Sequence, residues 1–349
     1  MKKVNNRFIH LDEETGHYVM DQEQVVRDQV EKDHWLTVLR TLLKDWRLYL
    51  MLVPMLFIFF CWRYLPMYEL LASFKVNTTG ALKVSDQFYC GFNNYITLLF
   101  GDYKFQFWQA FRNTFMLSFY GLLFGFPFPI ILAIFFNEIK SNVYRNILQV
   151  FTYLPKFIST VIITTLVWFL CAGSNNGMVE PGIISRLLVS LKMITQESAD
   201  SGLMHQAQYF RTVFILTGIW EGAGYGSIVY FAAIIAISPT SYEAAQIDGA
   251  GKMQQMRYVV LPSILSTIVI MLIVRIGSLL NVGFEQVILL RHIDTYTTAQ
   301  VVSTLAIDLK DAGNTNLATV PELINNVTSM LLVIGANMIS RKATETSLY

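Results

Sequence analysis

Charge and cysteine are both scarce in this sequence. Only 15% of its 349 residues are charged, against about a quarter in an average soluble domain, and 54% are hydrophobic. The net charge of +1 offers no attraction for nucleic acid or another polyanion. The three cysteines are scattered without metal-ligand spacing and predict no disulfide framework: Cys61, Cys90 and Cys171. These scarcities argue against a soluble, nucleic-acid-binding or disulfide-stabilised domain and favour a membrane protein.

Histidine is also scarce, and no residues cluster along the sequence as a catalytic or metal site would require. The five histidines are dispersed, and none lies inside an apolar run: His10, His17, His34, His205 and His292. A catalytic or metal centre within a membrane would need His, Asp or Ser at helical spacing. We therefore predict no catalytic residues, no metal site and no cofactor in this chain.

A phosphate-binding loop is not expected either. The stretch Gly249-Ala-Gly-Lys252 looks like the end of such a loop. The pattern, however, needs Gly at the place of Gln246 and Ser or Thr at the place of Met253. The chain is therefore not expected to bind ATP by that route.

What the sequence does contain is six long apolar stretches. Each can cross a hydrocarbon core, which needs roughly 20 residues of helix. They lie near residues 49–71, 111–136, 149–171, 211–237, 263–290 and 318–340. The predicted fold class is an all-α integral membrane protein with six transmembrane helices, which puts both termini on one side.

The predicted organisation is one membrane domain between two tails. Residues 1–47 would form a cytosolic tail ending in an interfacial helix, residues 48–342 the transmembrane domain, and residues 343–349 a C-terminal tail. The first 45 residues lack the apolar core of a secretory signal. Basic residues directly before the first span (Lys44, Arg47) and after the last (Arg341-Lys342) favour cytosolic termini.

The cytosolic connection 238–262 carries a pattern of its own. Ser238-Pro239-Thr240 is a helix-start signal, because Pro suits the first turn and the hydroxyls can cap free backbone N–H groups. Gly249 and Gly251 then interrupt the helix, and Pro262 closes the segment. The pattern predicts a short helix, a glycine break and a second short helix.

Polar residues recur at helical spacing inside the last three spans. In the fourth, Glu221 and Tyr225 are one turn apart. In the fifth, four residues fall on one arc of about 120°: Arg275, Ser278, Asn281 and Glu285. In the sixth, the corresponding residues are Glu322, Asn325, Asn326 and Ser329.

These polar residues support two interpretations. Ionisable groups at membrane depth normally face a bundle interior or a wet cavity, and carboxylates and amides beside aromatic rings suit a sugar. On that basis we predict a substrate path formed by Glu221, Tyr225, Asn281, Glu285, Asn325 and Asn326. The alternative is that the same groups join helices, or that those near span ends simply reach water.

One family resemblance rests on the cytosolic connection. Glu243-Ala-Ala-x-x-x-Gly249, nine residues, and then Val259-x-Leu261-Pro262 resembles the EAA loop of binding-protein-dependent ABC importer permeases, with Val259 where the family usually has Ile. Further stretches resemble landmarks of the MalF/LplB-like oligosaccharide permeases: Asp45–Pro54, Tyr64–Tyr68, Phe124–Pro127, Tyr153–Pro155, Gly226–Tyr230 and Asn281–Gln286. The likeness runs from about residue 44 to residue 342.

The resemblance implies the bundle of a type I ABC importer permease in a bacterial plasma membrane. Such a permease pairs with a second permease, usually a different chain, and with two ATPase subunits that bind ATP and Mg. An external sugar-binding protein or lipoprotein delivers the carbohydrate. Carried over to this chain, the residues that contact the ATPase and form its coupling loop would be Glu243, Ala244, Ala245, Gly249, Leu261 and Pro262.

The function that follows is import of an oligosaccharide or related complex carbohydrate by a permease subunit that is not itself an enzyme. Two alternatives remain at this point. One is a sugar-sensing membrane component, in which the same complex signals. The other is a secondary transporter that needs no ATPase, which inverted repeats and broken helices would favour; the sequence suggests neither feature.

Overall fold

The chain divides into two units, Met1–Glu69 and Leu70–Tyr349. The computed structural model describes residues 9–11, 18–20, 44, 46–76, 84, 87–174 and 180–344. In the first unit, β1 (Ile9–Leu11) and β2 (Tyr18–Met20) pair antiparallel. Most of the predicted tail 1–47, with its interfacial helix, and residues 345–349 lie outside the described residues.

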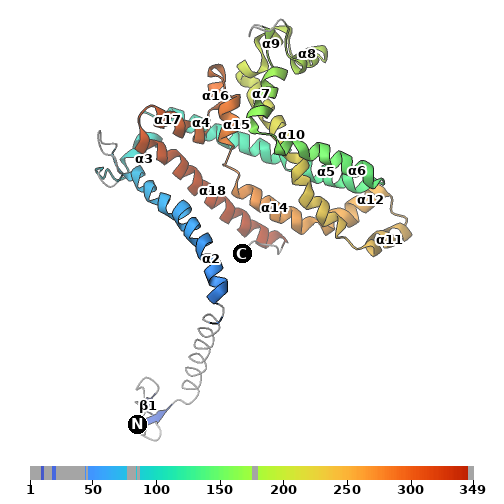
Figure 1. The fold of residues 1–349 in the computed structure, drawn as a ribbon, viewed down its shortest axis with the longest axis horizontal. Helices are drawn as coiled ribbons and strands as arrows, with labels where there is room; N and C mark the ends of the chain where they lie inside the picture. The colour runs from blue at the N-terminus through green and yellow to red at the C-terminus, as the bar shows by residue number, and fades with distance from the viewer. Residues whose placement is uncertain are drawn as a thin grey trace. The chain divides into compact units, whose positions relative to one another are not determined.

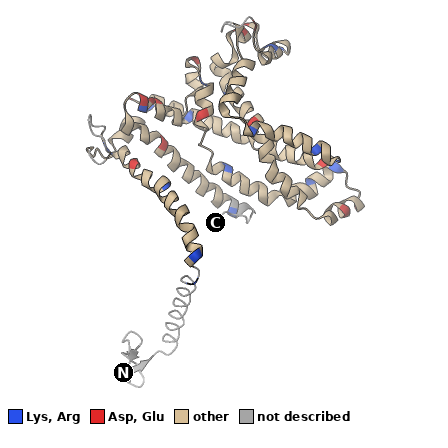
Figure 2. Ribbon diagram, viewed as in Figure 1, with Lys and Arg blue, Asp and Glu red and all other residues tan. Residues whose placement is uncertain are grey.

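Helices account for most of the described chain (Figure 1). Three are long and apolar enough to cross a membrane: Trp46–Phe74, Lys104–Glu138 and Thr315–Ile339. Three further pairs qualify only if each bent pair is one span: Asn142–Phe157 with Thr160–Leu170, Ala207–Ile235 with Pro239–Ile247, and Lys252–Ser263 with Leu265–Gly277. Counted in this way, the six predicted stretches each correspond to one span. Most charged residues lie near helix ends (Figure 2).

The first span is apolar on all sides. It consists of α2 (Trp46–Phe59), a π-helical turn η2 (Phe60–Tyr64) and the 3-10 helix η3 (Leu65–Phe74). None of the residues of α2 is buried within the part of the chain that the structure describes. A helix with apolar side chains all round is stable only in lipid or against other apolar helices, as expected of a membrane span.

The second span is one long helix with a π-helical turn in its middle. It is preceded by α3 (Asn93–Leu99) and runs from α4 (Lys104–Tyr120) through η5 (Gly121–Gly125) into α5 (Pro127–Glu138). Pro127 follows the π-helical turn within the continuous helix, and because proline has no backbone N–H, one helix hydrogen bond is missing at this point.

The third span is broken rather than straight, which corrects the expectation of one helix over 149–171. α6 (Asn142–Tyr153) and η6 (Leu154–Phe157) are bent by 99° against α7 (Thr160–Leu170). The chain turns at Ile158 and Ser159, whose backbones are extended, and the Ser159 hydroxyl accepts a hydrogen bond from Val161 N at 3.3 Å. The hydroxyl thus starts a new helix after the break.

One long helix follows a short helical excursion. The excursion contains α8 (Ile183–Ser190), α9 (Gln196–Ser201) and the single turn η8 (Leu203–His205). Next comes α10 (Ala207–Ile235), whose 29 residues span about 43 Å. The loop helix α11 (Pro239–Ile247) follows at a bend of 70°.

The rest of the chain returns along α10 and then closes the bundle. Its elements are α12 (Lys252–Gln255), η9 (Met256–Val260), α13 (Leu261–Ser263), α14 (Leu265–Gly277), α15 (Phe284–Leu290), η10 (Ile293–Thr295), α16 (Tyr296–Ala299), α17 (Val302–Asp311) and α18 (Thr315–Thr344). α10 packs along α5, while α14 and α17 both pack along α18. The last helix therefore continues to Thr344, slightly beyond the predicted boundary at 342.

Buried apolar residues form three clusters. Two lie along α10: one around Phe210 and Phe214 near its start, and one around Tyr230 and Ile234 near its end. The third joins α3 and α4 to α17 and the start of α18 around Leu305. Because α10 takes part in two of the three clusters, its position fixes much of the bundle.

A glycine sets the distance between α10 and α6. A Cβ added at Gly224 would overlap the backbone carbonyl of Thr152, so the helices can approach this closely only without a side chain there. Gly222 lies two residues earlier, about half a turn around α10. Apart from its chain neighbours and the nearby backbone of its own helix, no described atom lies within 4 Å of a Cβ added there.

Replacing Gly224 by Ala should therefore destabilise the bundle by about 1–3 kcal/mol, because the helices must separate. Gly222→Ala is the matched control, and it should leave the melting temperature unchanged or raise it, because Ala favours helix more than Gly does. Thermal unfolding of both purified variants in detergent measures the difference. Equal melting temperatures would show that the contact with Thr152 does not limit the packing.

Candidate functional site

The loop helix α11 begins as the sequence predicts but is capped differently. Pro239 occupies its first turn. The Ser238 hydroxyl, expected to cap the helix, instead pairs with the Thr240 hydroxyl at 2.7 Å. The prediction of a hydroxyl cap was therefore wrong, because the two side chains satisfy each other.

Gly249 ends α11 in a left-handed conformation, with φ at +77°. Gly249 N donates to Gln246 O at 3.0 Å, and Ala250 N donates to Ala245 O at 2.9 Å. These two bonds form a Schellman motif, in which glycine is favoured because a Cβ is strained at positive φ. The predicted glycine break is thus confirmed at Gly249.

The predicted coupling residues are mostly exposed, with Ala245 and Leu261 half-buried. Glu243, Ala244 and Gly249 are exposed, and Ile247 beside them is 86% exposed. On the inner side, Tyr242 packs against the cluster around Tyr230. After the break the chain enters a second short helix, and Leu261 and Pro262 lie in its last turn, where the polypeptide joins α14. A helix anchored on one face with an apolar residue outward is suited to docking.

A cavity of about 490 Å³ lies between the middle of α10, the α4–α5 helix and the residues that follow α14. Glycines form much of its wall. Gly218, Gly222 and Gly226 recur at four-residue spacing on α10 and so share one face, and Gly121 and Gly125 face them from η5. The absence of side chains at these five positions leaves room between tightly packed helices.

Polar groups point into this glycine-walled cavity. Lys156 Nζ and Glu221 Oε1 form an ion pair at 2.9 Å, and Arg275 and Asn281 also line the space. Ser118 Oγ and Gln286 Nε2 also belong to cavity-lining residues. Both atoms are shielded from solvent and have no hydrogen-bond partner among the described residues. Because these two atoms have almost no accessible surface, they do not reach the free space of the cavity in this conformation, although their residues line it.

The fifth predicted span does not continue as one helix, which corrects the predicted polar arc. α14 ends at Gly277, residues 278–283 are not helical, and α15 starts at Phe284. Arg275 and Glu285 therefore lie on different helices, and the predicted helical spacing does not hold between them. Asn281 lies in the break itself and reaches the cavity.

The structure brings together only part of the predicted substrate path. Glu221 and Asn281 line the cavity. The other four predicted residues do not: Tyr225 and Glu285 are exposed elsewhere on α10 and α15, Asn326 is exposed on α18, and Asn325 is buried. Asn325 Nδ2 donates to Leu280 O at 3.1 Å, a contact that joins helices as the alternative interpretation expected.

Glu221 sits near the middle of α10, so it is not a span-end residue that simply reaches water. Sequence reasoning missed Lys156, Ser118 and Gln286 as cavity residues, because they come from helices distant in sequence. The four-residue glycine spacing in α10 was a visible signal for the cavity wall.

The Lys156–Glu221 pair should make a measurable contribution to stability. Its side chains are 45% and 16% exposed, so solvent screens it in part. Lys156→Met should cost about 1 kcal/mol, because the less exposed carboxylate then lacks a partner. Glu221→Gln should cost less, because Lys156 still reaches water. Thermal unfolding of both single variants and the double variant tests the coupling. The double variant should lose less than the sum, and strictly additive losses would contradict the pair.

Comparisons with known proteins extend over this whole region. A family model described as "Binding-protein-dependent transport system inner membrane component" matches residues 125–292, which include most of the cavity wall and all of α11. The chain is 34% identical to protein LplB of Bacillus subtilis over 316 residues, covering 90% of this chain and 94% of LplB. It is 31% identical to YteP of the same organism, a polygalacturonan/rhamnogalacturonan transport system permease protein, over 91% of this chain and 95% of YteP.

Solved structures agree with these relatives. A chain of a bacterial ABC transporter involved in import of the acidic polysaccharide alginate superposes with a TM-score of 0.75 and 36% identity, covering 88% of this chain and 99% of that one. The resemblance drawn from the EAA loop is thereby confirmed. The protein is a multi-pass inner-membrane permease and not an ATPase subunit, and it belongs to the family of binding-protein-dependent transport system inner membrane components.

Proposed function

We propose that this chain is a permease subunit of an ATP-driven importer of oligosaccharides or related complex carbohydrates. The relatives YteP and the alginate transporter are named for acidic polysaccharides. The observation that carries the proposal is the position of α10. Its middle walls the polar cavity, and its C-terminal end leads directly into the exposed loop helix α11.

The cavity would form part of the sugar path. A sugar needs hydrogen bonds to its hydroxyls, and the Glu221 carboxylate and the Asn281 amide together supply both donors and acceptors. The basic groups of Lys156 and Arg275 suit an acidic sugar unit as well. Tyr225, Glu285, Asn325 and Asn326 would act outside this cavity, by supporting helices or at another stage of the path.

The loop helix α11 would receive the mechanical input. Glu243, Ala244, Ala245 and Gly249 would dock on a partner ATPase, and Leu261 and Pro262 would connect the docked segment to α14. Closure of two ATPases around ATP and Mg would shift α11, and the bundle would turn from inward-facing to outward-facing. Because α11 faces the ATPases, both termini would lie in the cytosol, on the same side.

The assembly would further contain a second permease and an external sugar-binding protein or lipoprotein. We expect the second permease to be a different chain. One solved alginate transporter was crystallised with an alginate pentasaccharide-bound periplasmic protein, and that transporter chain is 36% identical to this one with a TM-score of 0.76.

A secondary transporter is the less favoured candidate. Broken helices, which the sequence did not suggest, are present at 158–159 and 278–283. Such breaks also occur wherever backbone lines a cavity in a membrane protein. They therefore do not outweigh the identity to ABC permeases over most of the chain.

The substrate path can be tested by filling the cavity. Gly222→Leu places a side chain in the space between α10 and its neighbours, and it should lower the initial rate of labelled oligosaccharide uptake by about tenfold or more. Gly335→Leu on α18 is the matched control, because that glycine is also free of close contacts among the described residues but does not line the cavity. Uptake in a deletion strain carrying each variant measures the effect. Normal uptake by Gly222→Leu would exclude this cavity from the path.

Coupling can be tested with two equivalent glycines. Gly313, between α17 and α18, has φ at +85° and the same pair of hydrogen bonds, from its own N to Lys310 O and from Asn314 N to Leu309 O, both at 2.9 Å. Leu at either position meets similar backbone strain of roughly 1–2 kcal/mol. Gly249→Leu should abolish sugar-stimulated ATP hydrolysis by the assembled complex, whereas Gly313→Leu should retain it. Undiminished hydrolysis with Gly249→Leu would rule out the coupling role.

A further inference from the structure

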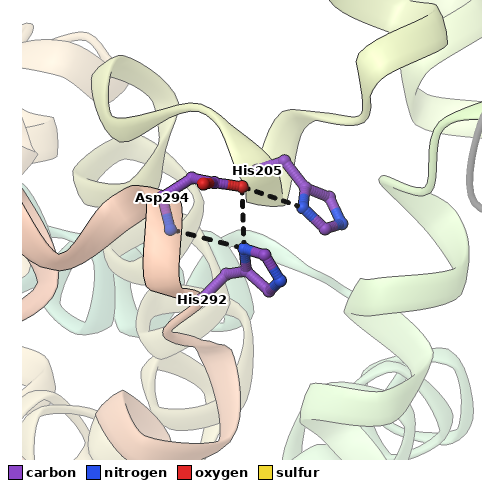
Figure 3. A group of neighbouring side chains, drawn as sticks. All are labelled: His205, His292 and Asp294. Atoms are coloured by element: carbon purple, nitrogen blue, oxygen red, sulfur yellow. Dashed lines mark hydrogen bonds and ion pairs between the residues drawn. The ribbon is translucent and has the colours of Figure 1, made fainter.

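Three metal-ligating side chains meet at the end of the bundle opposite α11. His205 comes from η8, just before α10, and His292 and Asp294 come from the turn η10 after α15 (Figure 3). The two histidines are 87 positions apart in the sequence. Although dispersed along the sequence, these two histidines therefore meet in space.

The ligand atoms converge on one carboxylate oxygen. Asp294 Oδ2 lies 3.0 Å from His292 Nδ1 and 3.6 Å from His205 Nδ1, and all three atoms lie within 4.8 Å of one another. A tetrahedral ion with bonds of about 2.0 Å places neighbouring ligand atoms about 3.3 Å apart. The two nitrogen–oxygen distances bracket that value.

The surrounding structure holds these residues in place. Met204 beside His205 and Thr295 beside Asp294 are both fully buried. Thr295 Oγ1 bonds to both His292 N and His292 O at 2.9 Å, which fixes the turn. The ring of Trp168 lies edge-on to both imidazoles, and its Nε1 donates to Leu289 O at 2.9 Å. The site is therefore built on ordered backbone and is not a chance meeting of mobile side chains.

The spacing of the three side chains suits one shared ion. The centroids of the two imidazole rings are 4.1 Å apart, and the Asp294 carboxylate lies beside both rings. One divalent cation could therefore bind a nitrogen of each histidine and the carboxylate oxygen at once.

We propose that His205, His292 and Asp294 bind a divalent transition-metal ion of the zinc type. Two imidazole nitrogens and one carboxylate oxygen suit zinc, whereas magnesium and calcium prefer oxygen ligands only. The partly exposed side chains leave a fourth position open to water or to a further ligand. The ion would connect η8, just before α10, to η10, which follows α15. Both α10 and α15 contribute residues to the cavity wall. This proposal does not depend on which substrate is carried.

The test is a Zn²⁺ titration of the purified full-length chain in detergent, without a polyhistidine tag, against a competing chromophoric chelator. We expect about one Zn²⁺ per chain, and an affinity lowered about tenfold or more by H205Q, H292Q or D294N, since even second-shell changes cost that much. H17Q is the matched histidine control and D200N the matched carboxylate control, and both should bind like the wild type. Mg²⁺ in excess should not compete.

Melting temperatures without metal check that each variant is folded. A wild-type chain that binds no Zn²⁺ at micromolar concentration would overturn the proposal. So would Zn²⁺ binding that is unchanged in H205Q and H292Q, because the ion would then be bound elsewhere.

Discussion

The constraint on which this structure depends is the pairing of backbone polar groups away from water. A helix pairs them internally, so every break within the bundle must be compensated by other groups. At 278–283 the carbonyl of Leu280 accepts a hydrogen bond from Asn325 Nδ2 on α18, and Trp168 Nε1 bonds to Leu289 O shortly after the break. The break thereby becomes a stable feature, and it brings Asn281 to the cavity.

Glycines determine how α10 packs against its neighbours. Glycines on two different faces of α10 give it close contact with α6 at Gly224 and leave a cavity at Gly218 and Gly222. Its 29 residues connect the loop helix at one end with the histidine pair at the other. A rigid element of that length can transmit a displacement at α11 to the cavity wall. The proposed sugar path and the proposed mechanical input thus involve the same helix.

Local signals predicted local structure well. Hydropathy indicated six stretches, and the glycine at 249 indicated the end of α11, because both depend on residues close in sequence. The breaks at 158–159 and 278–283 escaped prediction because each lies within a stretch that is apolar enough overall to be assigned to one span. The substrate-path residues were predicted on the assumption of unbroken helices. Because the fifth span is broken, the prediction was only partly right, and only Glu221 and Asn281 line the cavity. The positions of Lys156 and Gln286 in the cavity wall, and the proximity of His205 to His292, depend on contacts between segments distant in sequence.

The central claim is that sugar passes through the cavity between α10 and the break after α14. The most direct measurement is substrate protection of a cysteine placed at Asn281, in an assembled transporter whose native Cys61, Cys90 and Cys171 have been replaced. A transported oligosaccharide delivered by its binding protein with ATP should slow labelling of Asn281→Cys by a small thiol reagent, whereas a sugar that is not transported should have no effect. Labelling at the same rate during active transport would contradict the account.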